Sequence, residues 1–139
     1  MADRLSFRFK MTVEEISRVN GEIVAWMNAS RAPEALTHLA QLAVEELGTN
    51  VLKYGYDDDQ VHEVDVELEL TESGLEVTFV DDGRPFNPLE TMAPDVTLPV
   101  EERLIGGLGI HLLRSSADRL EYGRLNGKNR IRLFKQCKS

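Results

Sequence analysis

The sequence predicts an α+β fold: a two-layer α/β sandwich with a mixed, mostly antiparallel sheet and helices on one face. Three observations support this prediction. Apolar and polar residues alternate in three short segments, as they do in strands with one buried side. Two longer segments repeat apolar residues at helical spacing, and an Asn126-Gly127 pair marks a tight hairpin turn near the end. With 139 residues, the chain is expected to form one domain over residues 1–139.

The strands are expected in the order of one single strand followed by two hairpins. Residues 4–11 alternate and place one set of apolar side chains on a single face: Leu5, Phe7, Phe9 and Met11. Residues 64–70 and 75–79 alternate in the same way around a turn at 71–74, which predicts an antiparallel hairpin. Residues 120–124 and 128–134 flank Asn126-Gly127 and predict the second hairpin.

Three helices are expected. The first opens with a capping box, with Thr12 as N-cap and Glu15 reaching back, and buries Ile16, Val19, Ile23 and Met27. The second begins at Pro33, stops at Gly55, and buries the stripe Leu36, Leu39, Ala43, Leu47, Val51 and Tyr54. The third covers residues 110–117, follows the glycine run 106–109, and buries Leu113 and Ala117.

Composition excludes several classes of protein. With 24 acidic and 16 basic side chains, the net charge of −8 argues against a nucleic-acid surface. No signal segment opens the chain, and no apolar run approaches the roughly 20 residues of a membrane span, so no membrane partner is expected. The single cysteine, Cys137, excludes an internal disulfide and fits a reducing compartment. We therefore predict a cytoplasmic protein.

Polar side chains occupy positions where the core should be. Glu46 and Asn50, one turn apart, fall inside the apolar stripe of the second helix. Asp81 follows the alternation of Phe79 and therefore points inward at a strand end, with Gly83 close behind. Burying such groups unpaired costs roughly 1–3 kcal/mol each, so they need partners, either neighbouring backbone or a ligand.

The glycine run 106–109 precedes a helix, whose N-terminal N–H groups suit phosphate oxygens. Simple close packing is the alternative explanation of these glycines. The run lacks the third glycine of the dinucleotide fingerprint, and the chain has no P-loop pattern. Residues 89–105 before it lack a clear period, and so long a connection predicts a functional lid.

These features together match the needs of a nucleotide. An ionised Asp81 can accept a hydrogen bond from the exocyclic amine of adenine, and Gly83 lets a flat base approach the backbone. The amide oxygen of Asn50 is a hard ligand suited to Mg²⁺. Glu46 is placed to deprotonate a nucleophile near the γ-phosphate. Lys53 lies on the same stripe and could touch phosphate, or could equally be a surface lysine.

Three segments resemble the motifs of one family. EELGTN (45–50) is similar to the N-box of the GHKL ATP-binding superfamily, VDDGRPFNP (80–88) to its D-x-G box, and GGLGIHLLRSSAD (106–118) to its second glycine box. Within that superfamily the chain resembles the anti-sigma-factor serine kinases, over nearly its whole length. The resemblance implies a Bergerat-type fold, ATP with Mg²⁺, and phosphate transfer to a serine of a small antagonist protein. It also implies a sigma factor as a second partner and suggests a homodimer.

The resemblance assigns roles by position. Glu46 matches the family's general base and Asn50 its Mg²⁺ ligand, while Asp81 matches the adenine-binding residue and Gly83 its companion. The glycines that meet the phosphates correspond to Gly106, Gly107 and Gly109, with Leu108 between them. Two positions depart from the pattern. Tyr54 stands where these kinases often have histidine, and Ile105 where an arginine is frequent, although Arg103 could substitute.

Two other functions fit the same motifs. A nucleotide-sensing module could bind ATP or ADP and sequester a regulatory partner without phosphotransfer. The catalytic fragment of a histidine kinase is disfavoured, because the sequence offers no dimerisation helices or phospho-acceptor segment.

Overall fold

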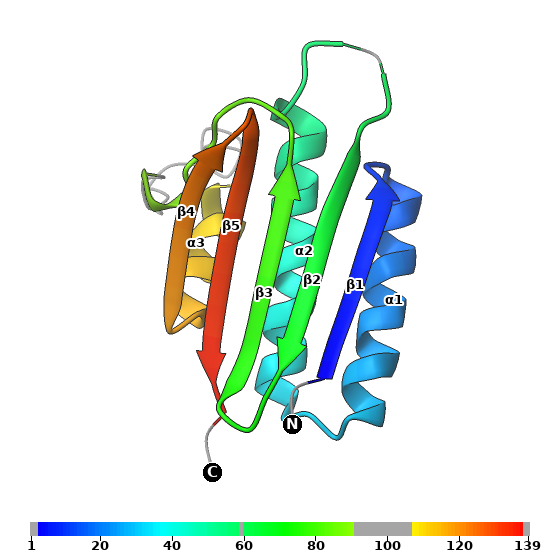
Figure 1. Ribbon diagram of the computed structural model, residues 1–139, viewed down its shortest axis with the longest axis vertical. Coiled ribbons are helices and arrows are strands. Elements are labelled where there is room, and N and C mark those ends of the chain that lie inside the picture. Colours follow the sequence, from blue (N-terminus) through cyan, green and yellow to red (C-terminus); the bar gives the residue numbers. More distant parts are fainter. Residues whose placement is uncertain (1–2, 59, 91–106, 138–139) are drawn as a thin grey trace.

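The computed structural model describes residues 3–58, 60–90 and 107–137, and these form a sheet with helices packed on one of its faces (Figure 1). The order of elements along the chain is β1 (Asp3–Lys10), α1 (Val13–Ala29), α2 (Glu34–Tyr54), β2 (Glu63–Leu70), β3 (Gly74–Asp81), a 3₁₀ turn η1 (Pro88–Glu90), α3 (Gly107–Ser116), β4 (Arg119–Leu125) and β5 (Lys128–Gln136). The strand order is β1-β2-β3-β5-β4. The predicted two-layer sandwich is confirmed, with one refinement: every described strand pair is antiparallel, so the sheet is not mixed.

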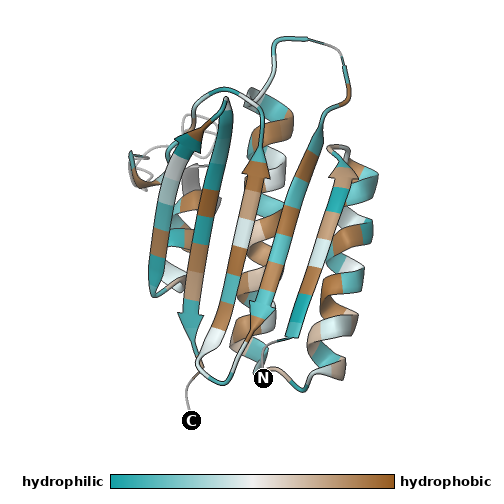
Figure 2. Ribbon diagram, viewed as in Figure 1, coloured by the Kyte–Doolittle hydropathy of each residue, from teal (hydrophilic) through white to brown (hydrophobic). Residues whose placement is uncertain are grey.

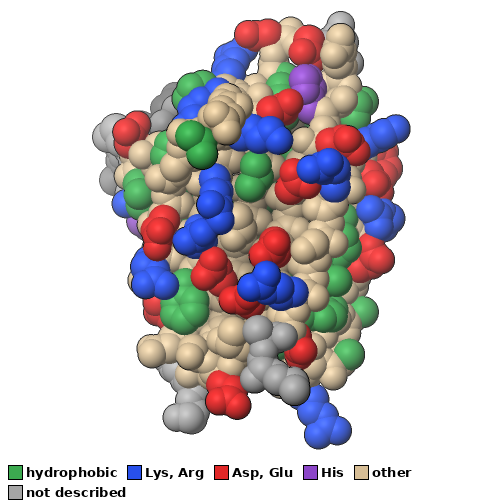
Figure 3. All heavy atoms as spheres, viewed as in Figure 1, with side chains coloured by type: hydrophobic (Ala, Val, Ile, Leu, Met, Phe, Trp, Pro, Cys, Tyr) green, Lys and Arg blue, Asp and Glu red, His purple; other side chains and the backbone are tan. Residues whose placement is uncertain are grey.

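The two faces of the sheet follow the alternation in the sequence, which Figure 2 shows as alternating apolar and polar bands along β2 and β3. In the middle of the sheet the inward side chains are buried against the helices; for example, Val66 pairs with Phe79, and Phe79 in turn with Ile131. The outward face carries charged side chains of both signs (Figure 3). Cross-strand ion pairs on this face are Arg4–Glu69, Arg8–Asp65 and Arg132–Glu76. Exposed pairs of this kind contribute about 0–1 kcal/mol each, so the buried face stabilises the sheet.

Helix α1 begins as predicted. The Thr12 side chain accepts a hydrogen bond from the Glu15 N–H at 3.1 Å. The second half of the capping box was predicted wrongly, because the Glu15 carboxylate accepts from Arg18 at 2.6 Å instead of reaching back. The predicted buried stripe is confirmed in full: Ile16, Val19, Ile23 and Met27.

Helix α2 differs from its prediction at both ends. Pro33 is the N-cap, with an extended ψ of 143°, so the helix starts one residue later at Glu34. The end at Gly55 is confirmed, and the Gly55 N–H donates to the Val51 carbonyl at 2.8 Å. Tyr54 was expected in the core but is 44% exposed. The core contacts of α2 end at Val51, because the backbone beyond it meets a loop at Gly55 instead.

The C-terminal elements are close to expectation. Helix α3 starts earlier than the predicted residue 110, within the glycine run. Leu113 is buried, whereas Ala117 lies past the helix end and is half-buried, so its predicted place in the core was wrong. Asn126 and Gly127 have φ values of 55° and 75°, the left-handed conformation that a type I′ hairpin turn requires. None of the helices in the described ranges combines the length and apolar character needed to cross a membrane.

Candidate functional site

The end of β3 carries a buried carboxylate. Asp81 is 4% exposed and lies on the helix side of the sheet, as its position in the alternation predicted. Its Oδ2 accepts two hydrogen bonds, from the Gly83 N–H at 2.9 Å and from Asn129 Nδ2 at 3.2 Å. Burial raises the pKa of Asp81, and these two donors oppose that shift by stabilising the ionised form. The other oxygen, Oδ1, accepts no hydrogen bond from any described residue.

Close packing explains why residue 83 is a glycine, which the sequence did not reveal. A Cβ at this position would lie 2.8 Å from the Gly55 carbonyl oxygen and 2.9 Å from Asp81 Oδ2. The next residue, Arg84, donates its backbone N–H to the Gly55 oxygen at 2.9 Å. The loop after β3 therefore fits directly against the end of α2, and glycine at 83 is what permits the contact.

Glu46 reaches the start of α3. Its carboxylate packs so closely on Gly109 that a methyl group there would overlap Oε2 and Cδ. Burial raises the pKa of Glu46, with the neighbouring Glu45 acting in the same direction and Lys53 in the opposite one. The structure thus brings the predicted catalytic carboxylate to the predicted glycine run, two features that are remote in the sequence.

Asn50 lies one helical turn after Glu46. It is half-buried, and its amide makes no hydrogen bond to the rest of the described chain. Within the described ranges, no three His, Cys, Asp or Glu side chains converge to hold a metal ion. A single amide ligand suits Mg²⁺, which takes its remaining ligands from phosphates and water.

The other predicted binding residues are placed less completely. Lys53 is exposed and lines a hollow between α1 and α2. Its positive charge also lowers the pKa of Glu46. Gly107 and Leu108 are the first residues of α3, so their backbone N–H groups belong to a helix N-terminus. Gly106, Arg103, Ile105 and the greater part of the predicted lid, residues 91–105, lie outside the described residues.

Asn129 is a site residue that our sequence reasoning missed. It is 1% exposed and lies beside Asp81 in the register of β3 and β5. Its Oδ1 accepts from the Tyr122 hydroxyl at 2.7 Å and from Arg124 Nη1 at 3.0 Å, and its Nδ2 donates to the Arg84 carbonyl at 2.6 Å. The strand alternation could have identified it. Asn129 is two residues before the apolar Ile131, so both side chains lie on the same face of the strand, and a polar side chain was therefore expected to point inward.

A second cluster, which we call the rim, lies next to Asp81 in the chain and consists of Tyr56, Asp58, His62 and Asp82. The Tyr56 ring stacks on His62 with centroids 3.6 Å apart, and its hydroxyl donates to Asp82 Oδ1 at 2.5 Å. His62 Nε2 lies 2.8 Å from Asp58 Oδ1, and that hydrogen bond raises the pKa of His62. Burial and Asp82 raise the pKa of Tyr56, which stays a neutral phenol. These contacts join the loop after α2 to the end of β3.

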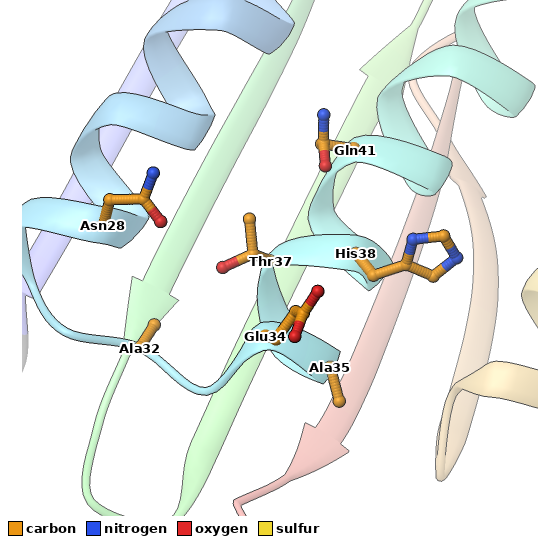
Figure 4. Close-up of a pocket in the computed structure, with 7 residues that line it drawn as sticks. All are labelled: Asn28, Ala32, Glu34, Ala35, Thr37, His38 and Gln41. Atoms are coloured by element: carbon orange, nitrogen blue, oxygen red, sulfur yellow. The ribbon is translucent and has the colours of Figure 1, made fainter.

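A separate hollow of about 720 Å³ lies beside the first turns of α2 (Figure 4). Its lining holds none of the residues predicted for the site: Asn28, Ala32, Glu34, Ala35, Thr37, His38 and Gln41. Glu34 is twelve residues before Glu46, about 18 Å along the helix at 1.5 Å per residue, so the two regions are distinct.

Comparisons with known proteins identify the family of the chain as a whole. The family of histidine kinase-like ATPase domains matches residues 9–135. The chain belongs to this family. Membership implies ATP binding and supports the GHKL resemblance that the three motifs indicated.

Individual relatives agree with this assignment. The chain is 31% identical over 85 residues to the serine-protein kinase RsbW of Bacillus thuringiensis (strain Al Hakam), covering 58% of this chain and 52% of the relative. It is 30% identical over 86 residues to RsbW of Bacillus mycoides (strain KBAB4), with the same coverage. The chain thus spans about half the length of the curated relatives it matches.

A solved structure supports the fold. The crystal structure of the RsbU and RsbW domains of a Mycobacterium tuberculosis protein superposes with a TM-score of 0.69 at 14% identity. The match covers 99% of this chain and 33% of that one. At this identity the likeness establishes the shared fold, and the functional argument rests on the family and on the site.

Proposed function

We propose that residues 1–139 form one ATP-binding domain that acts as an anti-sigma-factor type serine-protein kinase. It would bind Mg-ATP, phosphorylate a serine of a small antagonist protein, and bind a sigma factor. The family membership and the RsbW relatives support the class of activity. The antagonist and the sigma factor are carried over from the resemblance, and a cytoplasmic location from the composition, as parts of the proposal.

The observation that carries the proposal is the contact of Glu46 with Gly109. It joins an acidic side chain of raised pKa to the start of α3, one turn away from the unengaged amide of Asn50. A general base is most effective when its pKa lies near the working pH, so the burial that raises the pKa of Glu46 favours this role.

The roles of the residues follow from their chemistry. Glu46 accepts the proton of the attacking serine hydroxyl as that oxygen bonds to the γ-phosphorus and the bond to the ADP oxygen breaks. Asn50 Oδ1 would hold Mg²⁺, which neutralises the charge of the phosphates. Asp81 Oδ1 accepts from the adenine amine. The N–H groups at the start of α3, at Gly107 to Gly109, and the ammonium of Lys53 would attract phosphate oxygens.

The test is incubation of the purified chain with Mg²⁺, γ-labelled ATP and the small antagonist proteins of the same genome. The proposal expects label on a serine of one antagonist, and loss of that label in Glu46→Ala with nucleotide binding kept. Nucleotide-dependent binding of a partner without any label would favour the nucleotide-sensing module. Absence of ATP binding by calorimetry would contradict both functions.

A further inference from the structure

The side chain of Asn129 makes six hydrogen bonds to described residues, although the proposed reaction gives it no role. Three donors surround its oxygen: the Phe86 N–H, the Tyr122 hydroxyl and Arg124 Nη1. Three acceptors surround its nitrogen: Asp81 Oδ2 and the carbonyls of Gly83 and Arg84. These partners allow only one orientation of the amide, because a flipped amide would face donors with donors and acceptors with acceptors.

The fixed amide determines how the Asp81 carboxylate is turned. Oδ2 is held between the Gly83 N–H at 2.9 Å and Asn129 Nδ2 at 3.2 Å. Oδ1 accepts from no described residue and is therefore the oxygen left for an incoming donor. Without Asn129, only the backbone of Gly83 would restrain the carboxylate, and it could rotate about its Cβ–Cγ bond.

The same amide also holds the loop that follows Asp81. Nδ2 donates to the Arg84 carbonyl at 2.6 Å, and Oδ1 accepts from the Phe86 N–H at 3.2 Å. Arg124 adds a hydrogen bond to the Gly83 carbonyl at 3.0 Å. The hairpin β4–β5 therefore clamps both the carboxylate and residues 83–86 in one unit.

We infer that Asn129 is a positioning residue for nucleobase recognition: it orients the Asp81 carboxylate so that Oδ1 meets the 6-amino group of adenine. The inference rests on the proposed function, in which Asp81 accepts a hydrogen bond from that amine. Asn129 itself has no free donor or acceptor in this arrangement, so it acts on the base through Asp81.

The test compares two nucleotides by calorimetry on the full chain: ATP, and purine riboside triphosphate, which lacks only the 6-amino group. In the unchanged protein a charge-assisted hydrogen bond to the amine should favour ATP by about 10- to 150-fold in Kd. Asn129→Ala removes the donor to Asp81. Asn129→Asp keeps the size of the side chain but turns an acceptor toward three acceptors. In both variants we expect the preference for ATP to fall to about twofold, which is close to the scatter of double-mutant comparisons. The Kd for purine riboside triphosphate should change little.

Arg130→Ala is the matched control, since Arg130 is an exposed neighbour on the opposite face of β5 and should leave the preference unchanged. Equal weakening of both nucleotides in the Asn129 variants would show a merely structural role and overturn the inference. A preference kept in full would overturn it as well. A protein with no preference for ATP even when unmodified would instead contradict the adenine contact of Asp81, and with it that part of the proposed function.

A measurement on the unmodified protein covers the case in which the variants do not fold. The side-chain NH₂ signals of Asn129, assigned by ¹⁵N NMR, should shift when ATP binds and polarises the Asp81 carboxylate. Purine riboside triphosphate should cause a much smaller shift. Identical shifts with the two nucleotides would overturn the inference.

Discussion

Replacing Gly109 by alanine should separate the activity of this protein from its stability. An added methyl group would overlap Oε2 and Cδ of Glu46 and would lie 2.8 Å from Oε1. These atoms are the far end of a flexible side chain, so the carboxylate should swing away while the backbone of α3 stays in place. The substitution therefore moves the carboxylate of Glu46, the proposed base, while residue 46 itself remains a glutamate.

The expected magnitudes are well separated. Alanine is favoured over glycine in a helix by about 1 kcal/mol, which offsets the cost of moving the carboxylate. The free energy of unfolding should consequently stay within about 1 kcal/mol of the unchanged protein. Loss of a general base slows the reaction roughly 10²- to 10⁴-fold, or about 3–5 kcal/mol of transition-state stabilisation. The effect on the rate should exceed the effect on stability several-fold.

The assay combines urea unfolding, followed by circular dichroism, with transfer of labelled γ-phosphate to the antagonist protein. Glu46→Ala serves as the reference, and the double variant completes a cycle. If Gly109 acts only by making room for the carboxylate, the double variant should be no slower than Glu46→Ala alone. A Gly109→Ala protein with full activity, or two losses that add, would refute this reasoning.

Three further predictions concern the carboxylates and the rim. Glu46→Gln should slow phosphotransfer roughly 10²- to 10⁴-fold, with ATP affinity kept. Because the pKa of Glu46 is raised in the folded protein, ionising this carboxylate lowers the free energy of unfolding as the pH rises. The variant should therefore resist urea better than the unchanged protein at pH 7, and this difference should vanish below about pH 4. Asp81→Asn should weaken ATP binding by about 10- to 150-fold in calorimetry, and equal affinity would refute the adenine contact. Asp58 raises the pKa of His62, so the pairing of protonated His62 with Asp58 stabilises the fold at low pH and is lost as the pH rises through the folded-state pKa. His62→Gln should therefore be less stable than the unchanged protein mainly below about pH 6.5. A stability difference that is constant between pH 5 and 9 would contradict this role.

The predictions from sequence succeeded where a local pattern carries the information. Alternation identified the inward side of β3, and with it Asp81, because successive side chains of a strand point to opposite faces. Helical spacing identified the buried stripes of α1 and α2 up to Val51. Several errors lie at element ends, for example at Pro33, Tyr54 and Ala117, where packing and loop contacts rather than periodicity decide burial.

The sequence alone therefore determined the fold class, the strands and helices, the inward direction of Asp81 and, through its motifs, the family. Only the tertiary structure decided which distant residues meet. Asn129 lies 48 residues from Asp81, and their hydrogen bond depends on β5 pairing with β3. The contacts of Glu46 with Gly109 and of Gly83 with Gly55 likewise depend on how α2 packs against its neighbours. Periodicity specifies the face on which a side chain lies, whereas strand order, register and helix packing specify its partner.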